Sequence, residues 1–268
     1  MDGRDWGIFL LPYGQAVEEL KVKFKTLRME LKMRERYSWI EFVTGRVKRI
    51  SSILDKAKRL NVPMDQLESG IEDIAGIRIM CQFEQDIYHL ADLIRERKDM
   101  ELVYEKDYIR NKKESGYRSY HMIVKYPVQT SLGMKTVLAE IQIRTLAMNF
   151  WATIEHSLNY KYKAQLPREL YGRLQKAAEA AYRLDQEMGS IRQEIMESQT
   201  SFEDRSALVS KVLNGIQALY FYNRVQEAAS FQLRLTELWD NDEVWNMREL
   251  LQDIEAALEQ ATRSGESQ

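Results

Sequence analysis

The sequence predicts a mixed α/β protein, a sheet flanked by helices, that ends in a long helical region. Three observations support this fold class: amphipathic helical stripes open the chain, short β-branched runs occupy its middle, and a sustained heptad pattern follows. The length of 268 residues suits one sizeable domain with an appendage. Hydrophobic residues make up 44% and charged residues 30%, which is typical of a globular protein with a buried core.

The first half of the chain alternates between helical and strand patterns. Apolar residues at spacings of three and four predict helices over residues 14–33, 50–60 and 86–98. Runs rich in β-branched residues predict strands over residues 74–83, 120–126 and 136–144, with Gly133 in the turn between the last two. The second helix is expected to end near Asn61 and Pro63, because proline cannot continue a helix.

A heptad seam follows between Arg168 and Gln199, where apolar residues recur at alternating steps of four and three. Its members are Leu170, Leu174, Ala177, Ala181, Leu184, Met188, Ile191 and Ile195. Such a narrow stripe packs against another helix, either within the chain or in a partner subunit. Helical patterning continues over residues 206–261, before a polar tail. We therefore divide the chain into residues 1–165, 166–205 and 206–268.

The charge and cysteine content exclude several classes of protein. A net charge of −2 argues against a surface wholly committed to nucleic acid or to an anionic membrane, so any basic site must be local. The single cysteine, Cys81, lies in an apolar run and is expected to be a buried thiol in a reducing compartment. No apolar run approaches the roughly 20 residues that cross a bilayer. We expect a cytoplasmic protein without a signal peptide.

One face of the predicted helix 50–60, extended back to Lys48, carries polar side chains at steps of four, four and three. They are Lys48, Ser52, Lys56 and Arg59. A solvated helix face would look the same, but two arginines lie close by in the sequence. Arg46 precedes the helix, and Arg78 lies inside a strand pattern, where a long cation needs an anionic or aromatic partner. Since a guanidinium binds phosphate and also stacks on bases, these residues could hold a nucleoside triphosphate.

The strand pattern from Val137 to Thr145 alternates between apolar and polar residues. Glu140, Gln142 and Arg144 fall on one face, and three apolar residues fall on the other. The apolar face is expected to be core. The polar face is either a solvated outer surface or part of a functional site.

The segment Glu114–His121 combines a glycine with an aromatic ring and polar groups. Gly116 permits an unusual backbone turn, after which Tyr117, Ser119 and His121 are expected on a common side. An aromatic plate beside polar donors suits a nucleobase and its ribose. A purely structural hydrogen bond remains the alternative for the histidine.

Two carboxylates, Asp73 and Glu140, could converge on one cation although they lie far apart in the sequence. Mg²⁺ takes one or two carboxylates and leaves its other positions to water and phosphate oxygens. This suits phosphoryl transfer, in which positioning and charge neutralisation supply most of the catalysis. The chain has no glycine-rich phosphate loop with a terminal lysine, so side chains must grip the phosphates.

These motifs resemble the synthetase domain of RelA/SpoT-type alarmone synthetases, most closely the small RelQ-type enzymes, over roughly residues 1–200. The matching stretches are Phe42–Lys48, Asp73–Arg78, Lys113–His121, Glu140–Thr145 and Trp151–His156. The resemblance implies a nucleotidyltransferase-like mixed sheet flanked by helices. It also implies a GTP diphosphokinase of the stringent response, which moves pyrophosphate from ATP to the 3′-hydroxyl of GDP or GTP and yields AMP with ppGpp or pppGpp.

The resemblance further implies a role for each matching residue. Arg46 and Arg78 sandwich adenine, and Lys48, Ser52, Lys56 and Arg59 grip the phosphates of ATP. Asp73 and Glu140 hold Mg²⁺, and Glu140 is also the base for the attacking hydroxyl. Tyr117 stacks on guanine, while Lys113, His121, Gln142 and Asn149 surround the acceptor nucleotide.

Relatives of this type are typically homotetramers, and some bind pppGpp as an activator. Lys25, Arg28, Phe42 and Thr44 are compatible with such an activator site. The chain has three histidines, none followed by Asp, so the metal-binding His-Asp motif of hydrolytic relatives is missing. We therefore expect synthesis without hydrolysis. The resemblance gives no account of residues 206–268.

Two alternatives use the same residues for other functions. One is a nucleic-acid-binding regulator that holds single-stranded RNA on the basic strip Arg46–Arg59 and on Tyr117. The other is a different nucleotidyltransferase. Products separate these classes, because pyrophosphoryl transfer releases AMP whereas nucleotidyl transfer releases pyrophosphate.

Overall fold

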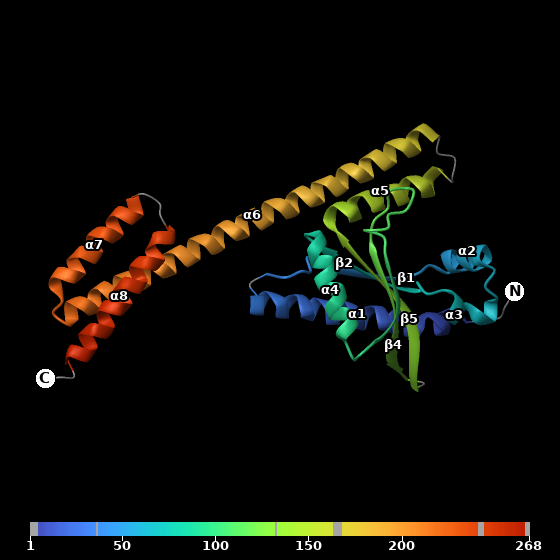
Figure 1. Ribbon diagram of the computed structural model, residues 1–268. Coiled ribbons are helices and arrows are strands. Elements are labelled where there is room, and N and C mark those ends of the chain that lie inside the picture. The colour runs from blue at the N-terminus through green and yellow to red at the C-terminus, as the bar shows by residue number, and fades with distance from the viewer. Residues whose placement is uncertain (1–4, 36, 132, 163–167, 241–243, 266–268) are drawn as a thin grey trace. The chain divides into compact units, whose positions relative to one another are not determined.

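Two units make up the chain, Met1–Ser190 and Ile191–Gln268 (Figure 1). The computed structural model describes residues 5–35, 37–131, 133–162, 168–240 and 244–265. The predicted boundary at 165/166 and the end of the polar tail therefore lie outside the described residues. Within the described residues, no helix is both long enough and apolar enough to cross a membrane.

A mixed sheet forms the centre of the first unit. Its strands are β1 (Phe42–Val47), β2 (Ala75–Cys81), β3 (Glu101–Asp107), β4 (Tyr120–Thr130) and β5 (Gly133–Thr145), in the order β1-β2-β5-β4-β3. β2 and β5 run parallel, and the other neighbours are antiparallel. The predicted fold class is confirmed, and the β4–β5 hairpin is longer than the sequence pattern indicates. β1 and β3 were not predicted, because these edge strands expose much of their length and lack an apolar run.

Helices α1 (Trp6–Glu35) and α4 (Glu84–Glu96) cover one face of the sheet (Figure 1). The apolar stripe predicted for the first helix is buried there, with Leu20 and Phe24 fully inaccessible. The predicted start at Gly14 is wrong. Residues 6–13 are apolar on nearly every side and so show no stripe, yet they are helical, and the Asp5 carboxylate accepts hydrogen bonds from the first turn.

Three of the remaining elements connect β1 to β2, and a fourth, α5, follows β5. They are α2 (Ile50–Leu60), the 3₁₀ turn η1 (Met64–Gln66), α3 (Leu67–Gly70) and α5 (Leu146–Tyr162). The prediction for α2 is confirmed, and the helix ends at Asn61 in the left-handed conformation with φ 52°. Cys81 is a free thiol with no exposed surface, as expected.

The first turns of α6 (Arg168–Phe221) pack on the loop that precedes β4. Gly116 has φ 89°, and a Cβ there would lie 2.6 Å from the Cβ of Ala178, so only glycine fits. The buried guanidinium of Arg118 stacks 3.9 Å from the ring centroid of Tyr182 and bonds Glu179 at 3.1 Å. The loop and the helix therefore hold each other in place.

The heptad seam lies on α6, which continues without a break through residue 205, where the sequence pattern suggested a division. On the isolated chain, Leu184 and Met188 of this seam expose 56% and 45% of their surface. No described residue of the chain buries these two large apolar side chains fully, so they can pack against a helix of another subunit.

The second unit is helical and has its own core. The end of α6 packs with α7 (Val225–Asp240) and α8 (Val244–Gly265). Their inward side chains are Val212, Ile216, Leu219, Ala228, Leu235, Leu238, Met247, Leu250 and Ile254. The helical patterning predicted for this region is confirmed, although α8 runs past the predicted end at Ala261.

Asp185 generates a prediction of pH-dependent stability. Burial, reinforced by the nearby Glu84, raises the pKa of this carboxyl to about 6, although the Thr145 hydroxyl donates to it and Arg118 lies near. An unfolded chain loses this proton near pH 4. Between these values the folded state binds more protons, so its stability falls as the pH rises through about 6.

We expect Asp185→Asn to be more stable than the parent at pH 8, by about 1–3 kcal/mol, because no charge is buried. The difference should vanish as the pH falls toward 4. Urea unfolding across this pH range measures it, with the exposed Glu187→Gln on the same helix as the control. Parallel pH curves for Asp185→Asn and the parent would contradict the assignment.

Candidate active site

The open face of the sheet carries polar residues from its central strands. The parallel β2–β5 register sets Gly76 beside Glu140, and β1 sets Arg46 on the other side of Gly76. Gly76 has no side chain, and a Cβ built there meets no atom closer than the Arg46 carbonyl oxygen at 3.7 Å. Arg46 and Glu140 therefore face each other across a gap in the sheet surface.

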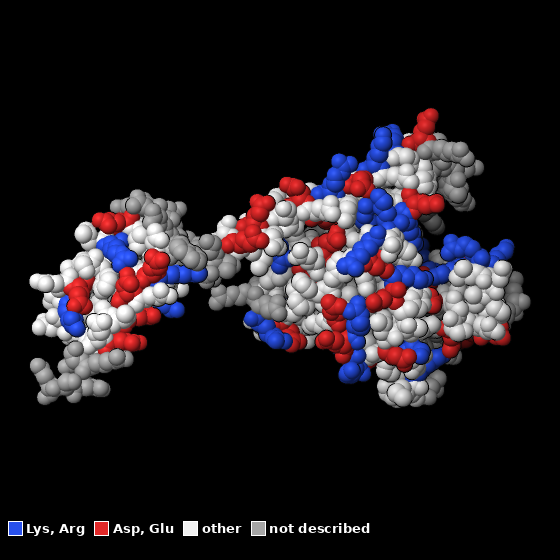
Figure 2. All heavy atoms as spheres, in the orientation of Figure 1, with Lys and Arg blue, Asp and Glu red and all other residues white. Residues whose placement is uncertain are grey.

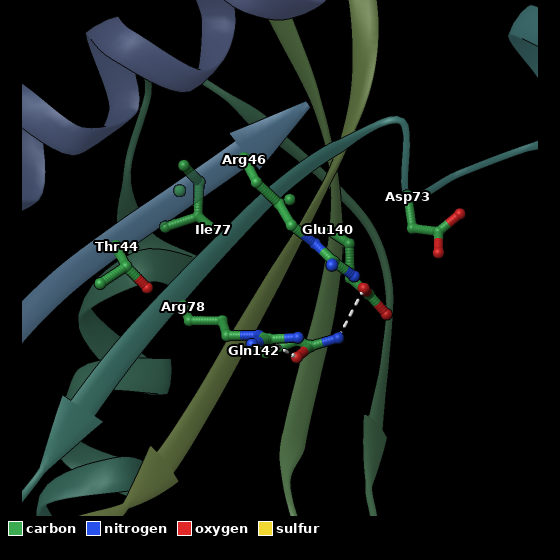
Figure 3. A pocket seen from close by; sticks show the side chains of 9 residues that line it. Thr44, Arg46, Asp73, Ile77, Arg78, Glu140 and Gln142 are labelled. Atoms are coloured by element: carbon green, nitrogen blue, oxygen red, sulfur yellow. Dashed lines mark hydrogen bonds between the residues drawn. The ribbon is translucent and has the colours of Figure 1, made fainter. Parts of the chain in front are cut away.

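The next row across the sheet continues the pattern. Arg78 on β2 pairs with Gln142 on β5, flanked by Thr44 on β1 and His121 on β4. A pocket opens over these two rows, and Figure 3 shows Arg46, Arg78, Glu140 and Gln142 directed into it. Its lining residues are Thr44, Gly45, Arg46, Asp73, Gly76, Ile77, Arg78, Glu140 and Gln142. The two predicted metal carboxylates thus both line one pocket.

Asp73 lies in the loop before β2 and is clamped by two lysines. Lys48 Nζ is 2.6 Å from Oδ2, and Lys56 Nζ is 2.8 Å from Oδ1. Burial alone would raise the pKa of this carboxyl, but hydrogen bonds and charge from both lysines outweigh it and leave the pKa lowered. The amphipathic α2 brings Lys56 here, because its apolar residues Ile53 and Ala57 face the core.

Glu140 accepts hydrogen bonds on both carboxylate oxygens. His121 Nδ1 lies 2.9 Å from Oε1, and Gln142 Nε2 donates to Oε2 at 2.7 Å. Burial would raise the pKa of Glu140, but His121 and Gln142 outweigh it, so the pKa is lowered even with the charge of Asp73 nearby. The carboxylate is therefore ionised at neutral pH.

Arginines dominate the other wall of the pocket. Arg78 Nε donates to the Gln142 side-chain oxygen at 3.2 Å. Burial lowers the pKa of Arg78, and repulsion from Arg144 and Arg46 lowers it further. Positive charge is thus concentrated in the pocket, and an anionic ligand would reduce the repulsion between the arginines. Basic side chains also gather over α2 beside the site (Figure 2).

An aromatic cluster stands at the β4 end of the site. The rings of Tyr117 and His121 meet edge to face, and Tyr108 contacts both. Lys113 Nζ lies 4.9 Å from the Tyr117 ring centroid and 4.6 Å from that of Tyr108. Sequence reasoning missed Tyr108, because it lies before the recognised motif and has no partner at a fixed spacing. It also assigned no role to Arg144, which bonds Gln142 and Tyr117.

Several candidates lie apart from this network. Ser52 and Arg59 are on α2, where Arg59 is exposed, and Asn149 is in the first turn of α5. In the described part of the chain, no hydrogen bond or ion pair joins these three to Asp73 or Glu140.

The four residues suggested for an activator site also differ in place. Thr44 lines the pocket itself. Lys25 is exposed on α1, Arg28 donates to the Ile40 carbonyl at 3.1 Å, and Phe42 is 40% exposed on β1. Their common role stays a prediction.

Known proteins share this architecture. Residues 45–165 match the family described as a region found in RelA / SpoT proteins. The GTP pyrophosphokinase YjbM of Bacillus subtilis is 57% identical over 202 residues, which cover 75% of this chain and 95% of that protein. Another Bacillus subtilis protein, the GTP pyrophosphokinase YwaC, is 39% identical over 71% of this chain and 92% of its own.

A crystal structure of small alarmone synthetase 1 from Bacillus subtilis, bound to its product pppGpp, is 58% identical with a TM-score of 0.69. The match covers 71% of this chain and 97% of that one. The same synthetase bound to AMPCPP is 53% identical with a TM-score of 0.64, over 72% of this chain and 98% of that one. On sequence and structure alike, this chain belongs to the RelA/SpoT family, among its small alarmone synthetases.

Proposed function

We propose that the protein is a GTP diphosphokinase, which transfers the β,γ-pyrophosphate of ATP to the 3′-hydroxyl of GDP or GTP. The observation that carries the proposal is one pocket lined by Asp73, Glu140 and two arginines, with Lys48 and Lys56 bonded to Asp73 at its edge. AMP and ppGpp or pppGpp are the products. The reaction is synthesis only, since no His-Asp pair of the hydrolytic type occurs in the sequence.

ATP occupies the β1–β2 side of the pocket in this proposal. The planar guanidinium groups of Arg46 and Arg78, which both line the pocket, enclose the adenine because guanidinium planes stack on aromatic rings. Lys48 and Lys56 exchange their bonds to Asp73 for phosphate oxygens. Ser52 and Arg59 extend the grip along α2.

The two carboxylates fit a Mg²⁺ ion. Mg²⁺ is bound through one or two carboxylates plus substrate phosphates, and Asp73 and Glu140 supply that number. In the described residues no cluster of three or more His, Cys, Asp or Glu side chains could form an all-protein cage. When bound, the ion would neutralise phosphate charge. Asp73 would contribute an ionised carboxylate once its lysines move to the phosphates.

Glu140 is the base in this scheme. It is ionised, and its two accepted hydrogen bonds leave lone pairs for the ribose hydroxyl proton. The acceptor nucleotide lies on the β4 side, with guanine on the Tyr117 ring. Lys113, His121, Gln142 and Asn149 surround it.

One prediction of the proposed function concerns the products. With Mg²⁺, labelled ATP and GDP or GTP, AMP and the guanosine tetra- or pentaphosphate should appear in equal amounts. Glu140→Gln should reduce the rate by roughly 10²- to 10⁴-fold without loss of nucleotide binding, because the base is gone. The control is Glu101→Gln on the exposed edge strand β3. Release of pyrophosphate instead of AMP would support nucleotidyl transfer and overturn the proposal.

Gly76 provides a further prediction. Its missing side chain keeps the pocket floor open, and a methyl group fits without a clash. Gly76→Val should therefore fold, since valine suits a strand, yet weaken ATP binding by about tenfold or more, or about 1.4 kcal/mol. Titration with a non-hydrolysable ATP analogue measures this, with Gly76→Ala as the intermediate step. Unchanged affinity in a folded Gly76→Val protein would contradict the ATP site.

Association through the exposed seam on α6 completes the proposal. We expect a homotetramer, and Leu184→Asp with Met188→Asp should reduce its mass in analytical ultracentrifugation, because charge opposes burial of the seam. Gln186→Asp, exposed on the same helix, is the control. An unchanged mass for the double variant would exclude the seam as the interface. Activation by pppGpp and binding of single-stranded RNA stay predictions.

A further inference from the structure

Five side chains on the acceptor side of the site form a closed ring of hydrogen bonds. The Tyr117 hydroxyl lies 2.8 Å from His121 Nε2, and His121 Nδ1 lies 2.9 Å from Glu140 Oε1. From the other carboxylate oxygen the ring continues through Gln142 to Arg144, whose Nη2 lies 2.8 Å from the Gln142 oxygen. The same Nη2 donates to the Tyr117 hydroxyl and closes the ring.

Arg144 and Glu140 together set the direction of the bonds in this ring, because a guanidinium has only donors and an ionised carboxylate has only acceptors. Its N–H faces the amide oxygen of Gln142, so the amide nitrogen is left to donate to Glu140. Arg78 Nε donates to the same amide oxygen at 3.2 Å and reinforces this orientation. One arm of the ring therefore runs from Arg144 through Gln142 to the carboxylate.

The second arm has the same direction. Because the Tyr117 oxygen accepts from Arg144, its own hydrogen is available for His121 Nε2. With Nε2 as acceptor, the neutral imidazole carries its hydrogen on Nδ1 and donates it to Glu140. Both arms thus begin at Arg144 as donors and end at Glu140 as acceptor.

We infer that Arg144 is a positioning residue that, through Tyr117 and Gln142, fixes His121 in its Nδ1–H form and orients Glu140 for proton abstraction. The inference rests on the proposed role of Glu140 as base. Arg144 itself is 4% exposed and is held by Nε to the fully buried Ser119 Oγ at 3.1 Å. It is thus a fixed origin for both arms.

The same guanidinium also locates the aromatic plate. Its Cζ lies 5.0 Å from the ring centroid of Tyr117 while Nη2 bonds the hydroxyl of that ring. The ring proposed to stack on guanine and the carboxylate proposed to take the ribose proton thus share one anchor. Lysine cannot replace it, because a single ammonium lacks the planar fork that reaches Ser119, Gln142 and Tyr117 together.

The arrangement of hydrogens in the parent protein tests the inference directly. The chain has three histidines, so a ¹⁵N-labelled sample gives few imidazole signals, and His121→Gln assigns the one that matters. In a sample at about pH 8, we expect His121 with a proton on Nδ1 and a bare Nε2. An Nε2–H form, or protons on both nitrogens, would overturn the inference.

Variants of the ring test the coupling. Tyr117→Phe keeps the aromatic plate but cuts one arm, and Arg144→Lys cuts both. We expect each to give a mixture of imidazole forms and to lower kcat by roughly 10- to 100-fold, with little change in the KM for ATP. The double variant should be no slower than Arg144→Lys, because that substitution already cuts the arm that Tyr117→Phe removes. If the fold-reductions in kcat of the two single variants instead multiply in the double variant, Arg144 does not act through Tyr117.

Three controls keep the outcomes separate. Arg110→Lys, on an exposed loop, should leave kcat and the His121 signal unchanged. If Arg144→Lys does not fold, the parent spectrum and Tyr117→Phe still decide the inference. A parent protein that makes no AMP or guanosine polyphosphate would refute the proposed function, whereas the His121 spectrum reports on the ring independently of activity.

Discussion

The parallel pairing of β2 with β5 is the constraint on which the site depends. It sets Ile77 beside Ile141 on the buried face and, one residue earlier, Gly76 beside Glu140 on the open face. A slip of one residue would move every apolar side chain of a strand to solvent. Since each buried isoleucine contributes about 1.5–3 kcal/mol, the core fixes the register strongly. The geometry of the polar face follows from the packing of the apolar face.

Charge is arranged around this frame with cations in excess. Arg46, Arg78 and two lysines face the carboxylates of Asp73 and Glu140 within a chain whose net charge is only −2. The lysines satisfy Asp73, whereas burial, together with repulsion from Arg144 and Arg46, lowers the pKa of Arg78. A triphosphate would supply the missing negative charge. The site is thus preorganised for an anion before one arrives, which is the arrangement that electrostatic catalysis requires.

Periodicity predicted much of this frame, because burial dictates it. The alternation of apolar and polar residues in β5 predicted which face is buried and placed Glu140, Gln142 and Arg144 together on the other face. The apolar stripe of α2 predicted which side of that helix carries its polar residues. Patterns failed where burial is not periodic. The start of α1 is apolar all round, and the edge strands β1 and β3 have no apolar run.

The contacts within the site were not predictable from local pattern. Lys48 and Lys56 meet Asp73 only because the end of β1, α2 and the loop before β2 converge in space. The bonds of Arg144 depend on side-chain geometry across β5 and the β4 loop. Resemblance to a family supplied the candidates, whereas only the fold shows which of them touch.

The acceptor side of the site is built jointly by the sheet and by α6. Tyr117 is bonded from the sheet side by Arg144, and its neighbours Gly116 and Arg118 are held by α6. The left-handed Gly116 lets the helix approach, and the stacked Arg118 fills the space beyond it. A loop with support on one side would leave the aromatic ring free to swing. Contacts from both sides hold the Tyr117 ring in place although the residue lies in a loop. A loop outside the sheet can therefore carry a residue that needs a fixed position.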